Sequence, residues 1–152
     1  MKRLGSSFVL FLVILSGCFR PGHLRVTMTN ESPPKFMFDG PGRWSECCST
    51  FFEFAVMEQT PDDPNPWDSH SNIDESPHLV WRVVPPNGYV NIPEAPDIRY
   101  GEVPRGWTQT HPKSGGAPVL LEGKRYVAGQ PHLSPEGTLL FMIQNGKPVI
   151  AR

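Results

Sequence analysis

The chain has 152 residues, of which 38% are hydrophobic and 19% charged, and its formal net charge is -1. This balance excludes a disordered polyelectrolyte, and we expect no nucleic-acid partner, because nucleic-acid binding needs a clustered basic face. The length is that of one globular domain with its own core. The 18 prolines leave no long stretch in which a helix extends.

The first segment combines a positive start with a short apolar run. Lys2 and Arg3 precede the uninterrupted apolar residues 8–15, FVLFLVIL. A membrane-spanning helix needs about 20 apolar residues, so this run is too short to span and has the length of the hydrophobic region of a signal peptide. We therefore expect residues 1–17 to be a signal peptide that is cleaved.

The apolar run leads into Leu15-Ser16-Gly17-Cys18, which resembles the lipobox of bacterial lipoproteins. The resemblance implies that the Cys18 sulfur carries a diacylglyceryl group and that the chain is cut just before Cys18. Two acyl chains give stable membrane attachment, whereas one chain binds only marginally. The alternatives are a plain secretory signal with an incidental cysteine, and an anchor that is not cleaved.

A short tether, residues 18–23, separates the lipidation site from the first predicted strand. The five residues 19–23 extend over at most about 17 Å, so we expect the single domain, residues 24–152, to work close to its membrane. By analogy with lipoprotein sorting in Gram-negative bacteria, an Asp after the cysteine favours the inner membrane. Here that residue is Phe19. We therefore expect a place in the bacterial cell envelope, on the periplasmic face of the outer membrane if the host is Gram-negative.

The domain shows strand patterns rather than helical ones. Short runs of alternating, β-branched or aromatic residues end at Gly, Pro or Asn. The predicted strands cover residues 24–29, 35–39, 50–59, 79–84, 89–92 and 97–104, two runs within 118–129 that pivot near Gly123, and a hairpin over 139–151. The segment 50–59 fits a strand buried on both faces or a short helix. About seven to nine strands predict an all-β fold, an antiparallel β-sandwich of immunoglobulin or fibronectin type, with a small barrel as the alternative.

The hairpin carries the clearest turn signal. Asn145-Gly146 separates two apolar runs by two residues, a pattern typical of a tight hairpin turn. Pro148 cannot donate a hydrogen bond to a neighbouring strand, so the last strand is predicted at a sheet edge or with Pro148 at a non-bonding position.

The second half of the domain resembles a group of small, uncharacterised bacterial lipoproteins. The segments that carry the resemblance are LVWRVVP, IRYGEVPRGWTQTHP, LLEGKRYVAG and GTLLFMIQNGK, between Leu79 and Lys147. The resemblance implies a lipoprotein with a β-sandwich-like domain. It implies no activity and no catalytic residues.

The other two cysteines, Cys47 and Cys48, are adjacent. They are either two reduced or buried thiols, a strained vicinal disulfide, or a pair used for intermolecular bonding, redox chemistry or a metal. Disulfides persist in an oxidising compartment such as the envelope. The alternative function is therefore a small envelope redox or ligand-binding protein that uses this pair.

An acidic, proline-rich loop covers residues 60–78. It contains Asp62, Asp63, Asp68, Asp74 and Glu75, with no Lys or Arg. A calcium site is one interpretation, and a zinc site with His70 and His78 beside Asp68 is another, although neither spacing matches a known pattern. The other interpretations are a solvated variable loop and a partner-binding loop with Trp67 as its anchor.

A second candidate binding loop lies at residues 100–112. Gly101, Pro104 and Gly106 shape this loop, and Arg105 and Trp107 are its large residues that we expect to be exposed. Such loops on a rigid sandwich often bind partners. The alternative is a loop that folds back and buries Tyr100 and Trp107.

No motif for catalysis appears, so we expect no enzyme, no catalytic or metal-ligating residues and no cofactor besides the lipid on Cys18. The sequence predicts a membrane-anchored, non-catalytic binding or assembly module with an envelope protein as its partner.

Overall fold

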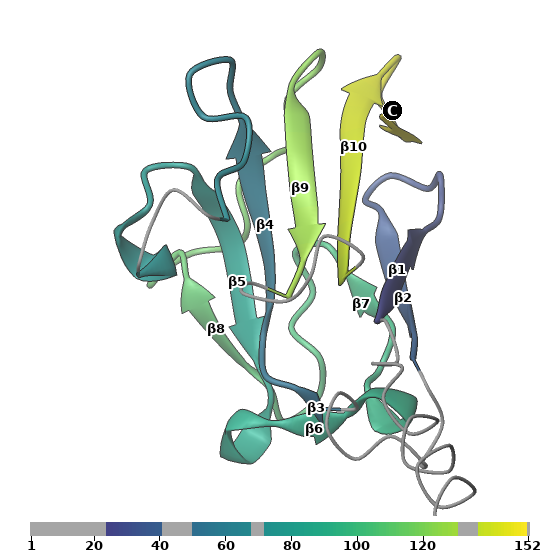
Figure 1. The fold of residues 1–152 in the computed structure, drawn as a ribbon, viewed down its shortest axis with the longest axis vertical. Helices are drawn as coiled ribbons and strands as arrows, with labels where there is room; N and C mark the ends of the chain where they lie inside the picture. The colour runs from purple at the N-terminus through teal and green to yellow at the C-terminus, as the bar shows by residue number, and fades with distance from the viewer. Residues whose placement is uncertain (1–23, 41–49, 68–71, 131–136, 152) are drawn as a thin grey trace, which may run out of the picture.

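The structure, a computed structural model, describes residues 24–40, 50–67, 72–130 and 137–151. This part of the chain is built from strands and three single-turn 3₁₀ helices (Figure 1). The strands are β1 (Arg25–Met28), β2 (Lys35–Asp39), β3 (Thr50–Phe51), β4 (Phe54–Gln59), β5 (Leu79–Val84), β6 (Val90–Asn91), β7 (Ile98–Arg99), β8 (Thr108–His111), β9 (Arg125–Gly129), β10 (Thr138–Gln144) and β11 (Lys147–Ile150). The helical turns are η2 (Ile73–Glu75), η3 (Pro86–Gly88) and η4 (Ile92–Glu94).

Two antiparallel sheets form the body of the molecule. The larger sheet has the order β11-β10-β9-β4-β5-β8, and the smaller has the order β1-β2-β7. A two-stranded ribbon, β3-β6, lies at one end of the sandwich (Figure 1). The predicted all-β sandwich is confirmed.

Aromatic side chains fill the space between the two sheets. Phe36 of the smaller sheet has no exposed surface, and its ring centroid lies 4.9 Å from that of Phe54 and 5.8 Å from that of Phe141. Trp81 packs edge-on against both Phe54 and Tyr100. Tilted and edge-on ring pairs at these distances add to the stabilisation that comes from burial.

The segment 50–59 forms two strands and no helix. β4 is buried on both faces: Phe54 and Val56 face the aromatic core, whereas Ala55 and Met57 belong to a second cluster on the outer face. An unbroken strand over this segment is expected to place Phe52 on the same face as Phe54, and Phe51 on the opposite face. This expectation is wrong at both positions, because the strand is interrupted between β3 and β4. Phe51 is therefore in the core, and Phe52 is exposed.

The C-terminal hairpin is as predicted. Asn145 and Gly146 both have positive φ, 54° and 70°, as a type I′ turn requires. β11 lies at the edge of the larger sheet. The Ala151 N–H donates to the Leu140 carbonyl, so the backbone N–H and C=O groups of residues 147, 149 and 151 point toward β10. The backbone of Pro148 therefore points away from β10. Both expectations for Pro148 are confirmed.

Three other segments differ from the expected strands. The strand expected over 97–104 is reduced to β7, Ile98–Arg99. The residues 108–111 were expected in a loop, but they form β8, which pairs with β5. The residues 118–121 were expected to form a strand, but they run as an irregular segment. Glu122, next to this segment, makes an isolated bridge with Ile143 of β10.

The contact between the sheets predicts a large effect for Phe36→Ala. Because Phe36 is fully buried against Phe54 and Phe141, we expect the free energy of unfolding to fall by about 3–5 kcal/mol, measured by chemical denaturation. The matched control is Phe52→Ala, which removes an exposed ring and is expected to change stability by about 0.5 kcal/mol or less. Equal effects of the two substitutions would contradict this account of the core.

Candidate functional site

Several predicted site residues lie outside the described part of the chain. These are Cys18, Cys47 and Cys48, and also Asp68 and His70 of the acidic loop. Lipidation of Cys18 and the state of the cysteine pair therefore stay predictions from the sequence.

The acidic loop covers the outer face of the larger sheet. Trp67 and Ile73 pack there with Ala55, Met57, Leu79 and Val127, and Trp67 is only 8% exposed. Trp67 as an exposed anchor for a partner is therefore wrong for this conformation. Its ring closes the second hydrophobic cluster, which the sheet would otherwise expose to water.

An ion-pair network fastens the same loop to the sheet. The Arg82 guanidinium of β5 lies 2.6 Å from the Asp74 carboxylate and 2.5 Å from the Glu53 carboxylate. Asp63 is buried, and its carboxylate lies 3.7 Å from His78 Nε2. The Arg82–Asp74 pair ties the loop to β5, whereas Asp62, Asp74 and Glu75 remain exposed to water, so the interpretation as a solvated loop stays open for these residues.

The carboxylates of this loop point to different partners. Asp74 pairs with Arg82, whereas Glu75 accepts a hydrogen bond from Asn72. Within the described ranges, no group of three or more His, Cys, Asp or Glu side chains converges on one point. The calcium and zinc interpretations receive no geometric support from these residues.

The second candidate loop does not present one surface. Arg105 is exposed, but Trp107 is half-buried, and its ring lies 5.9 Å from that of Phe51 in the core. Tyr100 is buried. The Gln109 side chain accepts from Trp81 Nε1 and donates to the Pro112 and Gly115 carbonyls, which pulls the following turn inward. Tyr100 and Trp107 therefore follow the folded-back alternative, and of these three residues only Arg105 is exposed.

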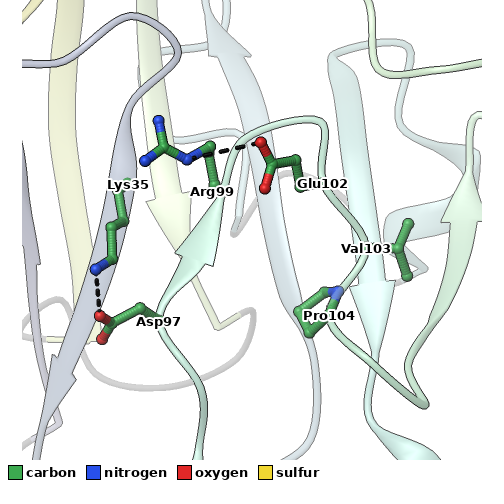
Figure 2. A pocket seen from close by; sticks show the side chains of 6 residues that line it. All are labelled: Lys35, Asp97, Arg99, Glu102, Val103 and Pro104. Atoms are coloured by element: carbon green, nitrogen blue, oxygen red, sulfur yellow. Dashed lines mark ion pairs between the residues drawn. The ribbon is translucent and has the colours of Figure 1, made fainter.

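A hollow of about 310 Å³ beside β2 and β7 is lined mainly by charged side chains (Figure 2). Lys35 Nζ lies 2.6 Å from Asp97, and Arg99 pairs with both Glu102 and Glu31. Because the cations are matched by neighbouring carboxylates, this hollow has no unbalanced charge with which to attract an ion.

The strongest candidate for a binding surface is apolar. Among the described residues, seven large hydrophobic side chains are exposed, and four of them lie near the β10–β11 hairpin. These four, with the partly buried Met28 of β1, line two hollows of about 400 and 480 Å³. We call this surface the apolar seam: Met28, Val119, Leu121, Val149 and Ile150.

The two hollows of the apolar seam are neighbours. Ser32 and Gly146 line one hollow, and Asn30 and Pro148 line the other. Asn30 and Ser32 are two residues apart in the chain, and so are Gly146 and Pro148, so the two hollows adjoin each other. The β1–β2 turn forms one wall and the β10–β11 hairpin the other, at the end of the sandwich away from the β3-β6 ribbon (Figure 1).

Buried hydroxyls hold the irregular segment that supplies Val119 and Leu121. Tyr100 Oη donates to the Pro118 carbonyl at 2.6 Å, and Tyr126 Oη accepts from the Leu121 N–H at 2.9 Å. The Glu122 carboxylate accepts from the N–H groups of Asn145 and Gly146. These bonds join the segment to the core and to the hairpin, so Val119 remains in place although it is 82% exposed.

The two tyrosines remain protonated at neutral pH. Burial, with a smaller effect of the neighbouring Tyr126, raises the pKa of Tyr100 well above its usual value. Burial likewise raises the pKa of Tyr126, against the hydrogen bond from Leu121. The hydroxyl of Tyr100 therefore remains a donor to Pro118 over the physiological range.

The described residues contain no helix that is long and apolar enough to cross a membrane. The chain matches no family model, and neither a curated protein nor a solved structure is significantly similar to it. The functional argument therefore depends on the residues of this chain. The sequence signal for the apolar seam was the run Val119-Leu120-Leu121, which was assigned to a strand and not to an exposed surface.

The hydroxyl of Tyr100 generates a prediction for the seam. Tyr100→Phe removes the bond to Pro118 and is expected to lower the free energy of unfolding at neutral pH by about 0.5–1.5 kcal/mol. The matched control is Tyr89→Phe, because Tyr89 is exposed and its hydroxyl is expected to add little.

The same substitution has an expected pH dependence. The pKa of Tyr100 is higher in the folded chain than its unfolded value of about 10, so its contribution to stability is complete below pH 10 and is lost as pH rises. Denaturation between about pH 9 and 12 should show a steeper loss of stability for the wild type than for Tyr100→Phe. Parallel curves would contradict the burial of this phenol.

Proposed function

We propose that this protein is a lipid-anchored envelope protein whose sandwich acts as a non-catalytic binding or assembly module for another envelope protein. The observation that carries the binding role is the apolar seam. Contiguous exposed apolar surface on a soluble domain is typical of a protein interaction site. The seam gathers four of the seven exposed large hydrophobic side chains of the described residues in one place.

The order of the chain supports a consistent orientation. The tether enters the domain at Leu24, directly before β1. β1 then runs toward the turn that forms one wall of the seam (Figure 1). With Cys18 as the lipidation site, the anchor attaches near one end of the sandwich and the seam lies near the other. The seam then faces away from the membrane, where a partner in the periplasm reaches it.

The composition of the seam indicates what the partner presents. Aliphatic side chains line the walls, and the carboxylate of Glu122 is occupied by backbone N–H groups of the hairpin turn. Because the edge at Pro148 lacks an N–H, strand addition is disfavoured at β11. A partner with a compact apolar face therefore fits better than an added strand.

Site-directed photo-crosslinking in cells tests this function. A photoreactive amino acid replaces Val149 in the seam or, as the matched control, Val103 outside it; their exposures are 41% and 42%. We expect a discrete crosslinked protein from position 149 and none from position 103. In the Cys18→Ala background the crosslink should disappear, because the domain no longer stays at the membrane.

Two results would contradict the proposal. Crosslinking with the same product from positions 149 and 103 would show that the seam is not selective. A Cys18→Ala protein that remains in the membrane fraction would remove the lipid anchor from the account.

A further inference from the structure

Two large aromatic side chains are exposed at the end of the molecule opposite the apolar seam. Phe52 is 53% exposed and Tyr89 is 57% exposed. They directly follow and precede the two strands of the β3-β6 ribbon. No hydrophobic cluster of the described residues includes either ring.

The register of the ribbon brings the two aromatic residues together. Thr50 pairs with Asn91, and Phe51 pairs with Val90. The same antiparallel register, continued by one residue, sets Phe52 opposite Tyr89. Phe51 points into the core, so the alternation of strand side chains turns Phe52 outward. We call Phe52 and Tyr89 the aromatic pair.

A hydrogen bond holds the backbone at Phe52, one member of the aromatic pair. The N–H of Phe52 donates to the side-chain oxygen of Gln130, which is buried, at 3.0 Å. This bond links the ribbon to the end of β9. An exposed ring on a fixed backbone loses little conformational freedom when another surface covers it, which favours binding.

The domain begins at the same end as the aromatic pair. Arg25 pairs with Asp39, which sets Leu24 level with Gly40. A side chain added at Gly40 would stand 2.8 Å from Ile92 Cγ2, and Ile92 follows β6 directly. The start of β1 and the ribbon therefore share the lower end of the sandwich in Figure 1.

We propose that the aromatic pair enters the headgroup layer of the membrane that holds the lipid anchor. This inference depends on the proposed anchoring at Cys18. The six residue-to-residue steps from Cys18 to Leu24 extend over at most about 20 Å, so this end of the domain is never far from the bilayer surface.

The chemistry of the two rings fits the bilayer interface. A phenylalanine ring is apolar, and a tyrosine adds a hydroxyl that remains in the wet layer, a combination that is typical of residues at the membrane interface. The contact fixes the tilt of the sandwich and directs the apolar seam away from the lipid. It depends on apolar area and needs no anionic lipid.

Energy transfer in vesicles tests the proposal. The full lipidated chain is purified from its membranes and reconstituted in phosphatidylcholine vesicles that contain a dansyl-labelled lipid headgroup. The native tryptophans are the donors, and none of them is changed. The test variant is Phe52→Ser with Tyr89→Ser, and the matched control is Val119→Ser with Leu121→Ser, which removes exposed apolar side chains at the other end.

We expect the test variant to lose a large part of the energy transfer that the wild type shows, and the control variant to retain it. Melting temperatures measured in detergent check that both variants are folded. Equal transfer in the wild type and the test variant, with all proteins still floating with the vesicles, overturns the membrane contact and leaves the anchor intact. If the wild-type chain does not float with the vesicles in the absence of detergent, the lipid anchor itself is refuted.

Discussion

The contact of Phe36 with Phe54 and Phe141 is the interaction on which the rest of the structure depends. It joins the three-stranded sheet to the six-stranded sheet, and each of these rings is fully buried. A single antiparallel sheet of this size has no way to bury both faces by itself. The same aromatic core extends through Trp81 to Tyr100, whose hydroxyl holds the wall of the apolar seam. The position of the apolar seam therefore depends on the packing of the aromatic core.

The larger sheet is covered on both faces by different means. The smaller sheet covers one face, and the acidic loop covers the other with Trp67 and Ile73. This explains why β4 carries apolar residues at successive positions. It also explains why an acidic loop contains a tryptophan: the carboxylates of Asp74 and Glu53 bind Arg82 at the border of the cluster, and the indole fills its centre.

The features that sequence alone predicted are those that depend on near neighbours. The hairpin at Asn145-Gly146 and the edge position of Pro148 follow from turn geometry and from a missing N–H, which are local properties. Trp67 is buried in a cluster that also contains Val127 of β9, a strand far along the chain, so no local pattern reveals its burial. β8 was missed because Thr-Gln-Thr-His lacks an apolar alternation; it pairs with β5 at the sheet edge, where polar residues are tolerated. The apolar seam was missed because an apolar run predicts burial, and the hydrogen bonds of Tyr100 and Tyr126 keep that run at the surface.

The proposed arrangement has an anchored end and a binding end, and its central claim is the lipid on Cys18. Mass spectrometry of the N-terminal tryptic peptide from isolated membranes tests it most directly. Because Pro21 follows Arg20 and hinders cleavage there, the expected peptide runs from Cys18 to Arg25. The account predicts that this peptide begins at Cys18 and carries the mass of a diacylglyceryl group. A peptide that continues through Gly17 into Cys18, or one that begins at an unmodified Cys18, would contradict it.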